Sequence, residues 1–579
     1  MFYHELGLPD LKMKQAYFTL QIKRACSLKL RSFTMKQTNS GKISLSQLVL
    51  LGLGSLIGSG WLFGAWEASS VAGPAAIFSW VIGFIIISLV AYNYIEVATM
   101  LPQSGGMSNY AQYTHGSLLG FIASWANWVA LVTIIPIEAV SAVQYMSSWP
   151  WEWAKFTSVL MKDGTISNIG LFAVYVIIII FSLLNYWSVK VLTSFTSLIS
   201  FFKLGVPTLT VILLLLSGFH PGNYGHSLSS FIPYGTAPIF AAVTVSGIIF
   251  SFNAFQTIIN MGAEIEKPEK NILRGIVICL SLTALLYVVL QSVFITSMPE
   301  NMVADKGWKG IQFNSPFADL AILLNLNWLA ILLYIEAFVS PFGTGVSFVA
   351  STGRVLSAME KNGHIPKILG HINKQYNIPR VAIIVNAILA MVMVTLFRSW
   401  GTLATVIATS TLVAYLTGPT TAMALRKMGP KLHRPFKARF LKIAAPLSFA
   451  LTSLAIYWAM WPTTAKVIFI IILGLPMYFF YEYKLNWENT RNQLRGSLWL
   501  IIYLLVLSGL SFIGSKDFNG INWIHYPYDF IVIIIVALVF YKIGIGSYFE
   551  SKYYKNAVEI NQTLEKDISS QAEAKTSSQ

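Results

Sequence analysis

The sequence predicts an all-α integral membrane protein with about 14 transmembrane helices, and three observations lead to this class. Of its 579 residues, 55% are hydrophobic and only 11% are charged, whereas a soluble chain of this length would carry roughly a quarter charged residues. Apolar runs long enough to cross a bilayer recur along the chain. Lysine and arginine are distributed unevenly between alternate connections of these runs. The composition therefore favours a polytopic membrane protein.

Fourteen apolar runs are long enough to span the bilayer as helices. They cover residues 44–70, 75–100, 117–148, 168–187, 191–217, 237–263, 273–297, 323–353, 380–397, 401–425, 441–461, 466–483, 497–514 and 527–545. The short connections leave no room for a catalytic domain. Neither a Walker-type phosphate loop nor a His-Glu-x-x-His motif occurs. We therefore expect no enzyme and no nucleotide-driven pump, and neither a cofactor nor a metal site.

Positive charge falls almost entirely on one side of the bilayer when the N-terminus is placed in the cytoplasm. Of the 40 lysines and arginines, one lies within a span, Lys203, and seven lie on the outer side. These seven are Lys155, Lys162, Lys306, Lys309, Arg398, Lys466 and Lys516. Cytoplasmic connections of membrane proteins carry such an excess. The net charge of +16 is therefore a topology signal, not a nucleic-acid-binding surface. It predicts a multi-pass protein of the inner (cytoplasmic) membrane with both termini in the cytoplasm.

The two ends of the chain lie outside the predicted spans. Residues 1–43 form a basic cytoplasmic arm without a signal peptide. This arm is either an interfacial segment or sequence translated upstream of a more ordinary start at Met35. Residues 546–579 form a polar cytoplasmic tail, for which we expect disorder over most of its length. The two cysteines, Cys26 and Cys279, cannot build a disulfide or zinc framework.

The first span contains an unusually glycine-rich stretch, residues 54–64 (GSLIGSGWLFG). Glycine destabilises a helix interior by up to about 1 kcal/mol relative to alanine. Irregular backbone survives in the bilayer core only where it lines a cavity or contacts a ligand. The Gly-Ser-Gly at residues 58–60 is therefore a candidate for a break in the helix. The alternative is a packing face, because small residues let neighbouring helices approach closely.

A second weak stretch lies five spans later. Residues 250–255 (FSFNAF) place Asn253, a poor helix former, between aromatic residues at mid-membrane. Interrupted helices at corresponding positions of two halves point to the binding site of a transporter. Because five is an odd number, the second set of helices enters the bilayer from the opposite side. Residues 44–217 and 237–425 are thus predicted to be inverted five-helix repeats, followed by four additional helices over 441–545.

Several motifs, together with these two breaks, resemble one superfamily. They are residues 101–106 (LPQSGG), 263–268 (AEIEKP), 353–354 (GR) and 363–366 (GHIP). Over roughly residues 40–420 the chain resembles a bacterial amino-acid permease of the amino acid–polyamine–organocation superfamily. Within it, residues 58–64 (GSGWLFG) and 136–139 (PIEA) look most like the aspartate–proton symporter branch. The resemblance implies a 5+5 inverted-repeat core with discontinuous helices 1 and 6.

The two breaks are the predicted substrate site. Amides at a helix N-terminus bind carboxylates, and carbonyls at a C-terminal end bind cations such as an ammonium group. The resemblance implies the same two groups for the carboxylate and the amine of an amino acid. Ser59 and Gly60 would offer amides, and Gly58 would allow close approach of the substrate. The carbonyls would come from Phe250, Ser251 and Phe252.

Three further residues beside the breaks are candidates for contact with the substrate. Asn253 is the most plausible polar partner of a substrate side chain. Trp61 and Phe255 are candidate gates, as are the ring side chains of Phe250 and Phe252. The alternative for each ring is ordinary packing, which is the commoner role of an aromatic side chain at mid-membrane.

Charged residues inside spans are functional candidates by default. In several members of the superfamily a lysine at the matching position of helix 5 lies where sodium binds in related carriers, and the resemblance implies a proton-coupling role for Lys203. The alternative is a permanently paired structural lysine. Glu67, Glu138 and Glu336 fall in the outer halves of their spans, where together they could line an outer vestibule. Each is a candidate for proton coupling, for pairing with Lys203 or for contact with a cationic substrate, with Glu138 the first choice; half-solvated positions are an equal alternative for Glu67 and Glu336. Glu96, near an inner helix end, is expected to make structural hydrogen bonds.

The leading prediction is proton-driven secondary active uptake of an amino acid. Aspartate or glutamate is implied by the resemblance alone, because three outer glutamates would repel an acidic substrate unless they were protonated. On electrostatics, a neutral or cationic amino acid is an equal alternative. Exchange of one amino acid for another is a second alternative, and a transport-inactive sensor is a third. The expected partners are the amino acid and the lipid bilayer, and the sequence indicates no oligomeric state.

Overall fold

The computed structural model describes residues 42–576 apart from 104, 188–189, 254, 374–378 and 485–489. Most of residues 1–43, including Cys26, therefore lies outside the described residues. The described chain is a bundle of helices with one short antiparallel hairpin, β1 (Met161–Lys162) with β2 (Thr165–Ile166), and one isolated parallel bridge between Ile43 and Ile265. The predicted all-α class is thereby confirmed.

The first predicted repeat begins with an interrupted helix and continues through long apolar helices. Its elements are α2 (Leu45–Leu56), α3 (Gly60–Ala72), η1 (Gly73–Ala75), α4 (Ala76–Met100), α5 (Gly106–His115), α6 (Ser117–Met146), η2 (Glu152–Leu160), α7 (Asn168–Trp187) and α8 (Lys190–Ser217). The long helix α6 is almost entirely enclosed by its neighbours, which places it at the centre of the bundle.

The second predicted repeat also begins with interrupted helix. After η3 (Pro221–Tyr224) and α9 (Leu228–Phe231), its elements are α10 (Ala237–Val245), α11 (Ile248–Phe252), α12 (Phe255–Asn260), η4 (Gly262–Glu264), α13 (Pro268–Ser297), α14 (Glu300–Gly310), α15 (Pro316–Leu323), α16 (Asn327–Lys361), α17 (Lys367–Gly370), α18 (Arg380–Leu396), α19 (Trp400–Tyr415) and α20 (Thr417–Met428).

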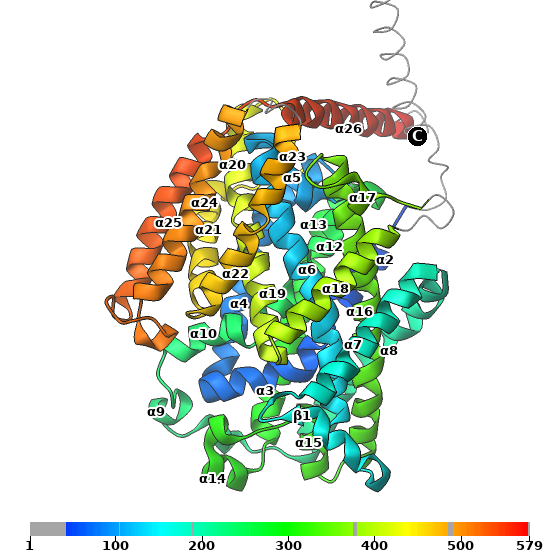
Figure 1. The fold of residues 1–579 in the computed structure, drawn as a ribbon, viewed down its shortest axis with the longest axis vertical. Coiled ribbons are helices and arrows are strands. Elements are labelled where there is room, and N and C mark those ends of the chain that lie inside the picture. The colour runs from blue at the N-terminus through cyan, green and yellow to red at the C-terminus, as the bar shows by residue number, and fades with distance from the viewer. Residues whose placement is uncertain are drawn as a thin grey trace, which may run out of the picture.

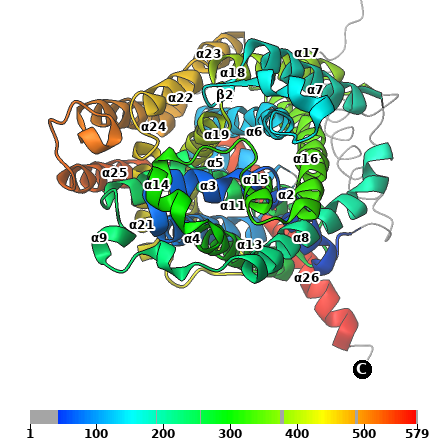
Figure 2. The same ribbon diagram turned by 90° about the horizontal axis from the view of Figure 1, so that it is seen from below.

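The remaining helices lie along one side of the bundle in Figure 2, where they pack on α4, α6 and α19. They are α21 (Leu441–Tyr457), α22 (Thr463–Ile472), α23 (Leu475–Lys484), α24 (Thr490–Ile513) and α25 (Tyr528–Gly546), with the short η5 (Lys516–Phe518) before α25. The last described element is α26 (Lys552–Thr576).

The helices satisfy the length and hydropathy that a membrane span requires. Among the described residues, nine helical segments are long and apolar enough, and one of them, Gly60–Met100, holds both α3 and α4. The bent pair Ala237–Val245 and Ile248–Asn260 makes a tenth candidate, and four shorter apolar helices accompany these. Each of the fourteen predicted runs contains helix. The protein is therefore a multi-pass membrane protein.

The core packs around α6. This helix lies against α16 and α19 along much of its length, while α13 packs against α2 and α4. Figure 1 shows α26 lying across one end of the bundle, which we call the α26 end. The opposite end, which carries α9, α14 and α15, we call the α15 end. The interrupted helices meet between these two ends.

The expectation of a disordered tail is wrong for its described part, because α26 is a helix that packs on α5. Tyr553, Tyr554, Ala557, Ile560 and Asn561 recur at the spacing of one helix face. Ala557 and Asn561 are buried, while most charged side chains of the helix point outward. Because the tail is polar overall, these five residues on one helix face did not stand out in the sequence.

Candidate functional site

The first span is broken where the glycine-rich stretch predicted it. Helix α2 ends at Leu56 and α3 begins at Gly60, so residues 57–59 lie between two helices. The carbonyl oxygens that the break frees are taken by side chains of other helices. Tyr287 donates to the Leu56 carbonyl at 3.3 Å, and Ser340 donates to the Ile57 carbonyl at 3.3 Å. Such substitutes for helical hydrogen bonds make a broken helix tolerable inside a membrane.

The sixth span is interrupted before the predicted stretch 250–255, of which residue 254 lies outside the described residues. Helix α10 ends at Val245, and Gly247, with φ of 76°, precedes the five-residue helix α11. The two parts of the span meet at an angle of 56°. Phe250, Ser251 and Phe252 therefore lie in a short helix, and the interruption at Gly247 is one that sequence reasoning missed. Its signal was a glycine, which adopts positive φ without strain.

The two broken helices touch each other at their interruptions. A Cβ atom on Gly60 would lie 2.5 Å from the Ser251 Oγ, so only glycine lets α3 and α11 approach this closely. Trp400, the first residue of α19, contacts residues at both interruptions. Its Nε1 donates to the Ser59 Oγ at 3.0 Å, and its ring meets that of Phe250 edge-on at 6.2 Å. Trp400 was not a predicted site residue.

The carboxylate of Glu138 accepts hydrogen bonds from the backbone amide at the first break. Both of its carboxylate oxygens accept from the Ser59 N–H, at 3.2 and 3.1 Å. A Cβ on Gly58 would lie 2.7 Å from the Glu138 Oε1, so Gly58 allows this close approach. The side chain is fully buried. The amide that we predicted for a substrate carboxylate thus already holds a carboxylate of the protein itself.

Lys203 lies beside the same break. Its Nζ donates to the carbonyl of Gly54 at 2.8 Å and to the Thr344 Oγ1 at 2.6 Å, which links α8 to α2 and α16. The residue is 4% exposed. It interacts electrostatically with the carboxylates of Glu138 and Glu336. The structure therefore brings together the lysine and the glutamate that the sequence singled out for proton coupling.

Glu336 lies on α16 in register with two residues that contact the break. Glu336, Ser340 and Thr344 follow one another at intervals of four residues, so they share one face of the helix. The residue is 0% exposed, and its carboxylate interacts with the hydroxyl of Ser340, which also donates to the Ile57 carbonyl. Glu67 lies apart, partly exposed and beside Gly401. The three acids therefore do not line one open vestibule as expected, because Glu138 and Glu336 are enclosed between helices.

The candidate gates flank the breaks within packed surroundings. Trp61 is buried in α3 with its ring 5.7 Å from that of Phe317 in α15. Phe255 is buried at the start of α12, 5.3 Å from the ring of Tyr415. The Tyr415 hydroxyl donates to the carbonyl of Asn253 at 3.3 Å. The Asn253 side-chain amide nitrogen is buried and has no partner among the described residues, so a donor remains available there.

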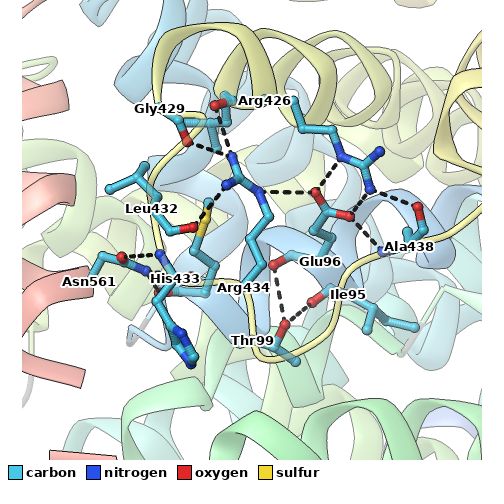
Figure 3. A network of polar contacts seen from close by, with 12 residues as sticks. Ile95, Glu96, Thr99, Arg426, Gly429, Leu432, His433, Arg434, Ala438 and Asn561 are labelled. Atoms are coloured by element: carbon cyan, nitrogen blue, oxygen red, sulfur yellow. Dashed lines mark hydrogen bonds and ion pairs between the residues drawn. The ribbon is translucent and has the colours of Figure 1, made fainter. Parts of the chain in front are cut away.

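A second buried charge cluster lies at the α26 end, away from the breaks (Figure 3). Glu96 of α4 receives two hydrogen bonds from Arg426, at 2.7 and 2.5 Å, and one from the Ala438 N–H at 2.7 Å. Arg434 lies 3.4 Å from the same carboxylate. These contacts fasten the segment after α20 to the end of α4, which is the structural role predicted for Glu96.

A membrane-embedded helical bundle with two interrupted helices in contact, and buried charges beside them, is the architecture of a membrane transporter rather than an enzyme. The chain belongs to the amino acid permease family, whose profile matches residues 43–475. The predicted membership of the amino acid–polyamine–organocation superfamily is thereby confirmed.

Three characterised relatives come from Bacillus subtilis (strain 168). The chain is 47% identical to the glutamate/serine transporter AimA, over 91% of this chain and 97% of the relative. It is 33% identical to an aspartate-proton symporter, over 87% and 96% of the two chains. It is 24% identical to the branched-chain amino acid permease BcaP, over 76% and 92%. All three are amino acid transporters and are similar to this chain over most of its length.

Proposed function

We propose that this protein accumulates amino acids by proton-driven uptake across the cytoplasmic membrane, with glutamate, aspartate and serine as its substrates. The names of two relatives, a glutamate/serine transporter and an aspartate-proton symporter, support this choice of substrates. The observation that carries the proposal is the pair of hydrogen bonds from the Ser59 amide to Glu138.

Substrate binding and protonation are linked through that amide. The N-terminus of α3 carries free backbone amides and a partial positive charge, which favour a carboxylate. The α-carboxylate of a substrate must displace Glu138 from the Ser59 N–H. A displaced carboxylate inside the bundle loses its donors, and a buried carboxylate without donors is stabilised by taking up a proton. Glu138 therefore couples arrival of the substrate to arrival of a proton.

Lys203 holds the first broken helix against α16. Its ammonium binds both the Gly54 carbonyl and the Thr344 hydroxyl, so loss of its proton weakens the link between these two helices. That link is where a conformational change that exposes the site to the other side would start. Lys203 is accordingly the second proton-coupling residue of the proposal.

The rest of the substrate meets the second break. Carbonyls at the C-terminal end of α11 attract the substrate ammonium, and the free amide donor of Asn253 binds the side-chain carboxylate of glutamate or the hydroxyl of serine. Trp61 and Phe255 close the site from the α15 and α26 sides. No ring other than these two is assigned a gating role.

The α26 end is assigned to the cytoplasm. The basic connection that contains Arg426, Lys427, Lys431, Arg434 and Lys437 lies at this end, together with the described beginning of the chain. Positive connections remain in the cytoplasm during membrane insertion. The α15 end then faces outward, and substrates enter the site from there.

Uptake of radiolabelled glutamate and serine into proteoliposomes tests the proposal. We expect accumulation under an inward proton gradient and none without it. Glu138→Gln is expected to lose gradient-driven accumulation but to retain exchange between labelled and unlabelled substrate. Glu264→Gln, at an exposed site away from the breaks, is the matched control. Full gradient-driven accumulation by the Glu138→Gln protein contradicts the assigned role, and uptake that requires internal amino acid identifies an exchanger instead.

A further inference from the structure

Helix α24 has one continuous exposed face. The residues on this face follow one another at intervals of three, four or seven, which keeps them on one side of the helix. They are Arg491, Arg495, Leu498, Ile502, Leu505 and Phe512. The other sides of α24 pack against α6, α22 and α25. The exposed face is therefore the surface that α24 turns toward the bilayer.

The length of this face matches the thickness of a bilayer. Its apolar side chains are well exposed, with 46% for Leu498, 43% for Ile502, 54% for Leu505 and 41% for Phe512. A helix rises about 1.5 Å per residue, so Arg495 lies about 26 Å and Arg491 about 32 Å from Phe512 along the axis. The hydrocarbon core is about 30 Å thick. With the apolar residues inside it, both arginines lie at its edge, where phospholipid headgroups begin.

The arginines belong to the α26 end of the molecule. The carbonyl of Gly496, next to Arg495, accepts a hydrogen bond from the Ser547 hydroxyl at 3.4 Å. Ser547 lies in the connection between α25 and α26. The headgroups that the face meets are therefore those of the leaflet at the α26 end, which is the cytoplasmic leaflet under the proposed orientation.

The placement of the two arginines is unfavourable without an anion. They are four residues apart, and like charges at this spacing repel each other on a helix surface. Both lie in the first two turns of α24, where the partial positive charge of the helix end disfavours cations. Among the described residues, neither guanidinium forms an ion pair with a carboxylate. An anion bound between them would relieve both repulsions.

We propose that this face of α24 binds a phospholipid with a net negative headgroup. Its phosphate accepts hydrogen bonds from the guanidinium groups of Arg491 and Arg495, whose paired donors match phosphate oxygens. One acyl chain lies along Leu498, Ile502 and Leu505. The charged and the apolar part of the lipid are thus recognised by the two parts of one helix face.

Other occupants fit this face less well. A zwitterionic phospholipid brings an ammonium group, which two cations repel. Free phosphate makes no use of the apolar residues. A second copy of the chain, related by a two-fold axis along the membrane normal, would bring the same two arginines to the same depth, where they would repel their counterparts.

Native mass spectrometry of the full chain, purified and delipidated in detergent, tests the proposal. The protein is titrated with dioleoylphosphatidylglycerol and, separately, with dioleoylphosphatidylcholine. We expect tighter binding of the first lipid. Each basic residue near an anionic lipid surface contributes about a factor of five to binding. The double variant Arg491→Gln/Arg495→Gln should therefore bind phosphatidylglycerol about 25-fold more weakly and phosphatidylcholine unchanged.

The matched control removes two other exposed cations at the α26 end. Lys427→Gln/Lys431→Gln changes the net charge equally and is expected to leave the affinity for phosphatidylglycerol nearly unchanged. An equal loss in both double variants would overturn the proposal, as would no loss in the arginine variant. Displacement of the lipid by an equal concentration of inorganic phosphate would identify a free anion site instead. A doubled mass that the arginine variant abolishes would assign the face to a second copy. Because lipid binding is measured without transport, none of these results depends on the proposed function.

Discussion

Replacing Glu96 by glutamine tests whether the charge cluster at the α26 end stabilises the fold. The carboxylate is 2% exposed and faces Arg426, which is 19% exposed, and Arg434, which is 7% exposed. Glutamine has nearly the same shape but carries no charge, and its amide nitrogen would point at one of the arginine donors. The substitution therefore removes one partner of a buried ion pair while leaving the packing in place.

The size of the effect follows from the bonds that are lost. Arg426 donates to the Glu96 Oε1 at 2.7 Å and to its Oε2 at 2.5 Å, and the Ala438 N–H also donates to Oε2. Hydrogen bonds to charged groups contribute about 1.5–3 kcal/mol each. Removing one partner of a buried pair costs about 3–5 kcal/mol. Because water reaches Arg426 and glutamine keeps one acceptor, we expect about 3 kcal/mol, the lower end of this range.

Thermal unfolding of the purified protein in detergent, followed by tryptophan fluorescence, measures this change. The matched control is Glu264→Gln, which removes an exposed carboxylate; the neighbouring Gly262 contacts Pro102 and Gln103, just after the end of α4. We expect a clear fall in the unfolding midpoint for Glu96→Gln and little change for the control. Equal midpoints for the two variants would refute the reasoning, because they would mean that the buried pair contributes no more than a surface charge.

Three further predictions concern single positions. Trp400→Phe removes the hydrogen bond to Ser59 but keeps the ring packing. Because such a bond contributes about 1 kcal/mol, substrate affinity measured by competition should fall about five-fold. Unchanged affinity would argue against the contact. Gly247→Ala introduces a side chain at φ of 76° and 2.6 Å from the Trp400 ring, so we expect little monodisperse protein on size-exclusion chromatography. Burial raises the pKa of Asp319 from 3.8 to about 6, so the native state keeps this proton to higher pH than the unfolded state does. Stability should therefore fall as pH rises from about 4 to 6, and Asp319→Asn should flatten this part of the profile of unfolding midpoint against pH.

The sequence predicted most of the fold because membrane spans depend on local composition. Each of the fourteen apolar runs became helix, and the glycine-rich stretch around Gly58 became a break. Both signals lie within a few consecutive residues. The helix of the tail was not predicted, because its five inward-facing residues are interspersed along the sequence with charged residues.

The parts of the site that sequence reasoning missed depend on contacts between distant residues. Trp400 and Ser59 are separated by 341 positions, and the first residue of an apolar run gives no hint of that hydrogen bond. Glu138 was a candidate for coupling, but its hold on the Ser59 amide follows only from how α6 and α3 are placed. The burial of Glu336 beside Ser340 is likewise a property of packing and has no local pattern.

Helix α26 has a consequence for the order in which the protein is assembled. Asn561 donates to the carbonyls of Met100 and His433 and accepts the His433 N–H, so α26, which follows every other described helix in the sequence, binds the end of α4. Until α26 has been synthesised, the Met100 carbonyl lacks this partner. The surface around Met100 and His433 is therefore completed after the rest of the described bundle, and a stop codon before Asn561 would leave it open for the lifetime of the molecule.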